Sequence, residues 1–157
     1  MGIAIFREAN DEQNLKAAPL FGNMGTVLQQ QMKLSDSLTF REKALAIQQK
    51  HLPMYHPDLG ISYNNIGTTY QFFGDFDRAL EYYNLVLEVN HKSLPPQHLD
   101  IGSAYANIGL LHAEKGDFPQ ALEYIQKAAV IFRKILPSQH PDVEKIEQII
   151  LDIYAEM

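Results

Sequence analysis

The sequence predicts an all-α protein built from repeated helix pairs. Two observations support this prediction: residues recur at a step of 42, and apolar residues between them follow helical spacing without strand-like alternation. Six columns of identical residues keep this step of 42. They are Gly25, Gly67 and Gly109; Asn23, Asn65 and Asn107; His56, His98 and His140; Asp58, Asp100 and Asp142; Pro53, Pro95 and Pro137; and Leu52, Leu94 and Leu136.

Each repeat predicts two helices joined by a tight turn. The first helices are expected at 17–31, 59–73 and 101–115, and the second helices at 35–51, 76–92 and 118–135. Gly74-Asp75 and Gly116-Asp117 supply the turns, because glycine commonly ends a helix. The first repeat has Met32-Lys33 instead, so its turn must differ, with Ser35 as a candidate N-cap.

The linkers between repeats carry a proline, a histidine and an aspartate. Proline stops the second helix, and we expect Asp58, Asp100 and Asp142 to cap the helices that follow. The recurring histidines raise the question of a metal site. Equivalent positions should lie a whole repeat apart, far beyond a metal–nitrogen bond of about 2 Å, so we expect linker histidines with a structural role and no metal.

The two ends depart from the regular repeat. The stretch "AIFRE" at 4–8 aligns with "VIFRK" at 130–134, 126 residues away, so we expect 1–16 to be a remnant second helix with its linker. Repeats 1, 2 and 3 then cover 17–58, 59–100 and 101–142, and 143–157 forms a terminal capping helix in one repeat domain. We expect residues 1–9 to fray or to dock onto a second molecule.

Composition and motifs exclude several classes of function. The net charge is -6 without a basic cluster, which argues against nucleic-acid binding. No stretch is apolar enough to span a membrane. The absence of cysteine and of an N-x-[ST] sequon fits a cytoplasmic protein. No catalytic or cofactor motif is present, so we expect no enzyme activity and no cofactor.

The chain resembles a tetratricopeptide repeat array of the 42-residue, kinesin light chain-like type. The second repeat carries the family pattern in Tyr63, Ile66-Gly67, Tyr70 and Ala79, and the third carries it in Tyr105, Ile108-Gly109, His112 and Ala121. The first repeat is looser, with Phe21, Met24-Gly25, Leu28 and Ser37. The resemblance implies a right-handed solenoid of antiparallel helix pairs whose first helices line a concave groove.

The resemblance also implies a scaffold for protein–protein interaction. The residues that it places in the groove, and that we expect to bind a peptide, are Asn23, Asn64, Asn65, Asn107, Thr26, Thr68, Gln29, Gln71, Phe72 and Leu110. An amide side chain suits this role because it both donates and accepts hydrogen bonds. Among the inward columns only Glu114 is charged, so the expected ligand is a protein segment with little charge.

Three alternatives remain open from the sequence. Asn65 could instead satisfy neighbouring backbone or inter-helix groups. The chain could be a structural segment of a longer array that serves a fused effector domain. It could also self-associate through its uncapped ends.

Two further expectations concern packing. His112 belongs to the core. Gly67 allows close helix approach, so Gly67→Leu should overpack the repeat at a cost of about 1–3 kcal/mol.

Overall fold

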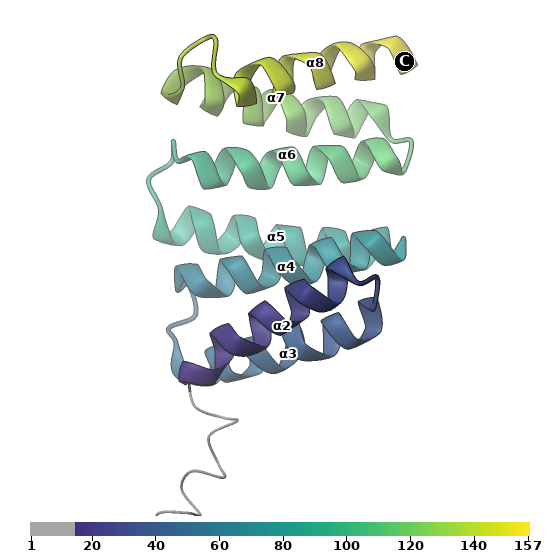
Figure 1. The fold of residues 1–157 in the computed structure, drawn as a ribbon. Coiled ribbons are helices and arrows are strands. Elements are labelled where there is room, and N and C mark those ends of the chain that lie inside the picture. Colours follow the sequence, from purple (N-terminus) through teal and green to yellow (C-terminus); the bar gives the residue numbers. More distant parts are fainter. Residues whose placement is uncertain (1–14) are drawn as a thin grey trace, which may run out of the picture.

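The computed structural model describes residues 15–157. All regular secondary structure in that range is helical (Figure 1). A short 3-10 turn, η2 (Leu15–Ala17), precedes seven α-helices. These are α2 (Ala18–Gln30), α3 (Leu34–His51), α4 (Pro57–Phe73), α5 (Phe76–Ser93), α6 (Leu99–Glu114), α7 (Phe118–Ile135) and α8 (Pro141–Glu156). The expectation for residues 1–9 lies outside the described residues, and so does that for the remnant helix and linker at 1–16 except for Leu15 and Lys16 in η2.

The helices stack in chain order, from α2 and α3 at one end to α8 at the other (Figure 1). Within the described range, substantial contacts between helices join consecutive helices only. The starts of α4, α6 and α8 at Pro57, Leu99 and Pro141 keep the step of 42, as do those of α5 and α7 at Phe76 and Phe118. This arrangement confirms the all-α solenoid of helix pairs.

The recurring glycines let each first helix approach its second helix closely. A Cβ at Gly67 would lie 2.9 Å from Cε1 of Tyr83, and one at Gly109 would lie 2.7 Å from Cγ1 of Ile125. Both neighbours are buried in the core. A Cβ at either position would therefore force these buried side chains or their helix to shift, which supports the close-approach role of these glycines.

The first repeat fills the same positions with polar side chains. Ser37 stands where the later repeats have alanine, and its hydroxyl donates to the Gly25 carbonyl at 2.6 Å. Arg41 stands in the column of Tyr83 and Ile125, and only 5% of its surface is exposed. This substitution of polar for apolar groups explains why the family pattern is looser in the first repeat.

Arg41 joins the first three α-helices through its guanidinium group. Its Nη1 donates to Oε1 of Gln29 on α2 at 2.5 Å. The same atom also donates to two acceptors on α4, the Asn65 carbonyl at 2.6 Å and the Thr69 hydroxyl. Its Nε is buried without a hydrogen-bond partner among the described residues. Burial lowers the pKa of the Arg41 guanidinium from its ordinary value. The side chain is therefore a buried cation held by neutral acceptors.

Arg41→Tyr is expected to leave the free energy of unfolding unchanged or raised. Tyrosine reproduces the arrangement of Tyr83 against Gly67, and well-packed replacement of a buried charge is often neutral or stabilising by about 1–4 kcal/mol. Arg41→Ala should instead destabilise the array, because it leaves a cavity beside Gly25. Urea unfolding of both variants checks this, and a tyrosine variant as unstable as the alanine variant would contradict it.

The turns within repeats separate the first repeat from the other two. Gly74 and Gly116 adopt φ angles of 77° and 78°, which glycine reaches without steric cost. In the first repeat Met32 takes that conformation, with a φ of 59°. The N-cap of α3 is Lys33, which makes no side-chain capping bond, so the expectation that Ser35 caps this helix is wrong.

The linker histidines, and not the aspartates, cap the first helices. His56, His98 and His140 each stand at the N-cap, and each Nδ1 accepts a hydrogen bond of 3.2 Å from the backbone N–H two residues on. The expectation that Asp58, Asp100 and Asp142 are the caps is therefore wrong by two positions. These residues lie in the first turn, where a carboxylate favours the positive end of the helix dipole.

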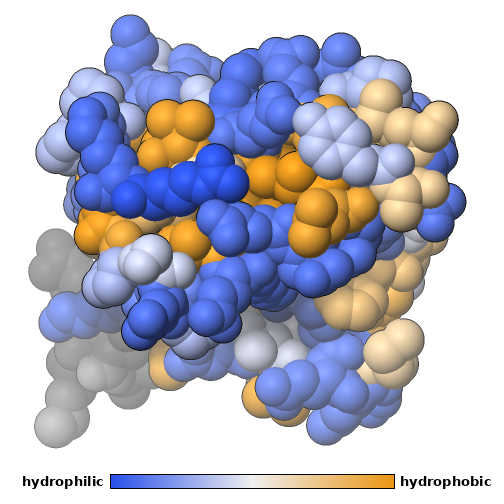
Figure 2. Space-filling model, turned by 90° about the horizontal axis from the view of Figure 1, so that it is seen from above, coloured by the Kyte–Doolittle hydropathy of each residue, from blue (hydrophilic) through white to orange (hydrophobic). Residues whose placement is uncertain are grey.

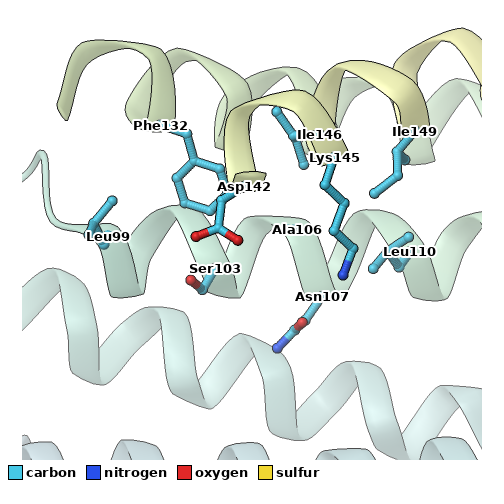
Figure 3. A pocket seen from close by; sticks show the side chains of 10 residues that line it. All are labelled: Leu99, Ser103, Ala106, Asn107, Leu110, Phe132, Asp142, Lys145, Ile146 and Ile149. Atoms are coloured by element: carbon cyan, nitrogen blue, oxygen red, sulfur yellow. The ribbon is translucent and has the colours of Figure 1, made fainter. Parts of the chain in front are cut away.

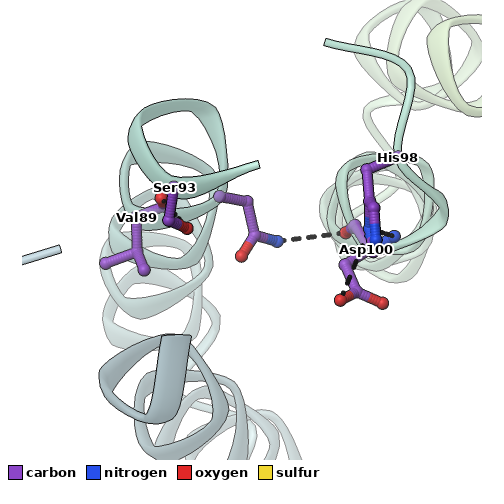
Figure 4. A network of polar contacts seen from close by, with 5 residues as sticks. Val89, Ser93, His98 and Asp100 are labelled. Atoms are coloured by element: carbon purple, nitrogen blue, oxygen red, sulfur yellow. Dashed lines mark hydrogen bonds and ion pairs between the residues drawn. The ribbon is translucent and has the colours of Figure 1, made fainter. Parts of the chain in front are cut away.

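The cap of α6 also connects to the preceding helix (Figure 4). Nδ2 of Asn90 on α5 donates to the Asp100 carbonyl at 3.1 Å, in the turn that His98 caps. The linker histidines thus have the structural role expected of them, since each fixes where a first helix begins.

His98→Ala is expected to lower the free energy of unfolding by about 0.5–2 kcal/mol, the usual cost of losing an N-cap acceptor. His98→Asn should restore most of that loss, because asparagine also accepts from the first turn of a helix. Thermal unfolding followed by circular dichroism compares the two variants. If asparagine fails to restore stability, the histidine ring acts by packing and not by capping.

Candidate functional site

Two hollows lie beside each other along the first helices. The hollow between α4 and α6 has a volume of about 380 Å³, and the hollow between α6 and α8 about 310 Å³. Ser103 and Asn107 line both, so the two hollows adjoin. Ile61 in the first corresponds to Ser103 in the second at the repeat step of 42. We call the two hollows together the inner groove.

The two halves of the inner groove differ in chemistry. Around the α4–α6 hollow stand three amides, which belong to Asn64, Asn90 and Asn107. The α6–α8 hollow has the apolar side chains Leu99, Leu110, Phe132, Ile146 and Ile149. Its charged residues come from α8, from which Lys145 extends toward α6 while Asp142 lies beside the Phe132 ring (Figure 3). The amides are therefore concentrated at the α4–α6 hollow and the charged side chains of α8 at the other, whereas both hollows have apolar walls.

A side-chain hydrogen bond links the first helices of the second and third repeats. Nδ2 of Asn107 on α6 donates to Oδ1 of Asn64 on α4 at 2.9 Å, and both side chains are half-buried. The structure gives no other hydrogen bond to the side chain of either asparagine within the described residues. Each amide thus keeps hydrogen-bonding capacity on the wall of the groove.

Asn65 contributes mainly through its backbone. Its carbonyl accepts from Arg41 at 2.6 Å and from the Thr69 hydroxyl at 3.0 Å. Within the described residues no hydrogen bond reaches its half-buried side chain, and this residue does not line either hollow. The structural alternative for Asn65 therefore applies to its main chain, whereas its amide stays available.

Other residues expected in the groove form a polar network next to it. The Tyr83 hydroxyl donates to Oε1 of Gln71 at 2.7 Å and lies 3.3 Å from the Thr68 hydroxyl. Gln71 in turn donates through Nε2 to Glu114 at 2.6 Å. Burial raises the pKa of the Tyr83 phenol above its ordinary value, and the hydrogen bond with Thr68 opposes that effect. The network keeps Glu114, the one charge expected in the inward columns, paired with an amide.

Of the ten residues expected to bind a peptide, three line the inner groove: Asn64, Asn107 and Leu110. On α2, Asn23 and Thr26 are exposed, and Gln29 is half-buried against Arg41. Phe72 is 56% exposed near the end of α4. The structure therefore brings Asn64, Asn107 and Leu110 together in the groove. The predicted residues of the first repeat do not line it, although Arg41 connects Gln29 to the Asn65 carbonyl.

Sequence reasoning missed several groove residues. Lys145, Ile146 and Ile149 lie on α8, which was treated only as a cap, although Lys145 is two repeat steps from Ile61. Asn90 and Phe132 belong to second helices and form repeat-equivalent parts of the two linings. Of these five, the step of 42 applied to the predicted columns reaches only Ile149, which lies 42 residues after Asn107.

His112 packs against an aromatic ring, as expected for its column. Its imidazole lies parallel to the Tyr124 ring, with ring centroids 5.6 Å apart and planes at 6°. Its Nδ1 lies 3.4 Å from Oδ2 of Asp117.

No cluster of three or more metal-ligating side chains occurs in the range 15–157. None of the helices described is both long and apolar enough to cross a membrane.

A stack of helix pairs with a groove along its first helices defines a helical-repeat interaction protein. The sequence profile of the tetratricopeptide repeat family matches residues 16–92 and again residues 58–134. The chain belongs to the tetratricopeptide repeat family. No curated protein matches the sequence.

Solved structures with the same fold include kinesin light chain-like repeats. The crystal structure of BtubC (BKLC) from P. vanneervenii has a TM-score of 0.82 at 19% identity and covers 88% of this chain. A putative kinesin light chain from Podosopora anserina, with nearly identical TPR-like repeats, has a TM-score of 0.79 at 21% identity; the match covers 94% of this chain and 68% of that one. The apo form of RapI has a TM-score of 0.80 at 20% identity over 98% of this chain. The chain spans 56% of the BtubC chain and 54% of the RapI chain.

Proposed function

We propose that the protein is an interaction scaffold that holds a weakly charged peptide segment of a partner protein in its inner groove. The main observation is the Asn107–Asn64 bond at the wall of two adjoining hollows. A peptide main chain repeats a donor and an acceptor at every residue, and a side-chain amide can pair with both. The amides of the α4–α6 hollow therefore suit a main chain, and the apolar walls of both hollows suit side chains of the same segment.

The balance of charge in the groove favours a segment with little charge. Lys145 and Asp142 line the same hollow and offset each other, Asp100 adds one carboxylate at the α4–α6 hollow, and Glu114 is already bonded to Gln71. A strongly acidic or basic segment would leave one of these groups facing a like charge, which disfavours the wrong partner.

A phage-displayed library of random peptides, selected on the full chain, tests the proposal. We expect selected peptides to share an apolar residue and to be poor in charge, and to bind through the groove. Fluorescence anisotropy with one labelled peptide then measures the affinity of the wild type and of groove variants. If the affinity does not change when groove residues are replaced, the peptide binds elsewhere, which leaves the structural-segment alternative.

A further inference from the structure

A pocket of about 330 Å³ lies where the linker before α6 meets α7. Its walls include Gln97 of the linker, Tyr105 of α6, and Lys127, Val130 and Lys134 of α7. We call it the linker pocket, and it shares no residue with the inner groove. Viewed from the α8 end, apolar side chains form a band between hydrophilic ones where the described residues stop (Figure 2). The linker pocket instead lies within the array, between elements that have neighbours on both sides.

The second repeat fills the equivalent space with a tyrosine ring. At the repeat step of 42, Tyr55 corresponds to Gln97 and Glu88 corresponds to Val130. The half-buried Tyr55 reaches from its linker to α5, where its hydroxyl donates to Oε1 of Glu88 at 3.2 Å. Its ring therefore lies between the two walls that Gln97 and Val130 form in the third repeat. Val130 is 64% exposed and has no acceptor atom in its side chain, so the third repeat leaves this space open.

The charge around this space also differs between the two repeats. Lys127 and Lys134 stand three residues before and four residues after Val130, so the three side chains share one face of α7. Lys127 donates to Glu123 at 2.6 Å, and its Nζ lies 5.9 Å from the centroid of the Tyr105 ring. The structure gives Lys134 no hydrogen bond or ion pair within the described residues. Among those residues no carboxylate lines the pocket, so ammonium groups flank the place where Glu88 meets the tyrosine hydroxyl in the second repeat.

We propose that the linker pocket binds a phosphotyrosine side chain of a partner protein. The aromatic ring takes the position that Tyr55 fills in the second repeat, and the phosphate lies between Lys127 and Lys134. An apolar cavity of about 150 Å³ can hold a benzene ring, so a pocket of about 330 Å³ leaves room for the phosphate. The phosphate brings negative charge and three acceptor oxygens to the two ammonium groups. An unmodified tyrosine would bring a hydroxyl donor to a place without an acceptor side chain.

Amide NMR spectra of the full chain, recorded during titration with N-acetyl-phosphotyrosine amide, test the proposal. We expect saturable shifts of the signals of residues 96–97 and 127–134. The affinity should fall as the salt concentration rises from about 0.05 M to about 0.5 M, because salt screens exposed charges. N-acetyl-tyrosine amide, N-acetyl-phosphoserine amide and inorganic phosphate should each bind about tenfold more weakly or worse, since each lacks either the charge or the ring.

Variants of the pocket separate the roles of the ring space and the charge. Gln97→Tyr combined with Val130→Glu copies the second repeat, so the introduced ring should fill the pocket and abolish phosphotyrosine binding. Lys134→Gln should weaken binding about two- to fivefold, the range expected of one exposed ion pair. Lys92→Gln, in the same column of the second repeat, serves as the matched control and should bind as the wild type does. All four sites are exposed, so thermal unfolding should show that each variant folds.

Four outcomes would overturn the proposal. Inorganic phosphate that binds as well as the phosphotyrosine probe would show a plain anion site, and unmodified tyrosine that does so would show a purely apolar one. Shifts that are absent, or that are confined to residues of the inner groove, would remove the linker pocket as the site. The same holds if the Gln97→Tyr, Val130→Glu variant folds and binds the probe as the wild type does. None of these outcomes depends on the peptide proposed for the inner groove, because the substituted residues line neither of its hollows.

Discussion

Gly109→Leu is expected to destabilise the array by about 1–3 kcal/mol or more, the usual cost of overpacking a core. A Cβ at this position already meets Cγ1 of Ile125 at 2.7 Å and the Ala121 carbonyl oxygen at 3.1 Å. The carbonyl belongs to the backbone of α7 and cannot turn away as a side chain can. Even Gly109→Ala should therefore lose more through crowding than the approximately 1 kcal/mol that it gains in helix propensity.

Gly22→Ala provides the matched control for this experiment. Gly22 also lies inside a helix, but a Cβ there has no neighbour within 4 Å among residues 15–157. The same substitution should therefore stabilise the chain by up to about 1 kcal/mol. Urea unfolding of the two alanine variants gives the difference directly. Equal effects of the same sign at both positions would mean that close helix approach is not the reason for the recurring glycine.

Asn64→Leu combined with Asn107→Leu is expected to weaken binding of a library-selected peptide by about tenfold or more. Each hydrogen bond lost to the peptide contributes roughly 0.5–1.5 kcal/mol, and a factor of ten corresponds to about 1.4 kcal/mol. The free energy of unfolding should change by less than about 1 kcal/mol, because the two side chains are half-exposed and the bond between them is a single one. Fluorescence anisotropy and thermal unfolding on the same variant measure both quantities.

Two controls make this result decisive. Asn84→Leu introduces the same chemistry at an exposed position of α5 outside both hollows, and it should change neither quantity. Asn65→Leu is the second control, because the Asn65 side chain lies outside both hollows although this residue shares the column of Asn107. A large loss of stability with unchanged affinity in the double variant would assign Asn64 and Asn107 a structural role and remove the groove from the proposed function.

The architecture could be predicted from the sequence because the residues that make the same packing contacts recur in three repeats. A single glycine within a helix is ambiguous, but Gly25, Gly67 and Gly109 in one register indicate a close contact that each repeat must make. The helix starts were less predictable. Aspartate is a common N-cap and histidine is not, so propensity favoured Asp58 over His56, although the ring nitrogen of His56 makes the bond.

The groove could be predicted only in part. The prediction used the first helices of the three repeats, whereas the linings also include residues of α5, α7 and α8. Asn107 was expected there, but its partner Asn64 belongs to a different column, and only the stacking of α4 beside α6 brings the two together. Lys145 was missed because its column, which contains Ile61 and Ser103, was not among the columns expected to face the groove.

The stacking of the helices in chain order has a consequence for cooperativity. Within the described range each α-helix packs substantially only on the α-helices before and after it. Each one is therefore stabilised mainly by its two neighbours in the stack. An opening at one end can then occur while the centre stays folded. A peptide in the inner groove would touch α4, α6 and α8 at once, three helices that are not consecutive. Such a ligand supplies the longer-range coupling that the packing lacks, and the bound array should unfold more nearly as a single unit.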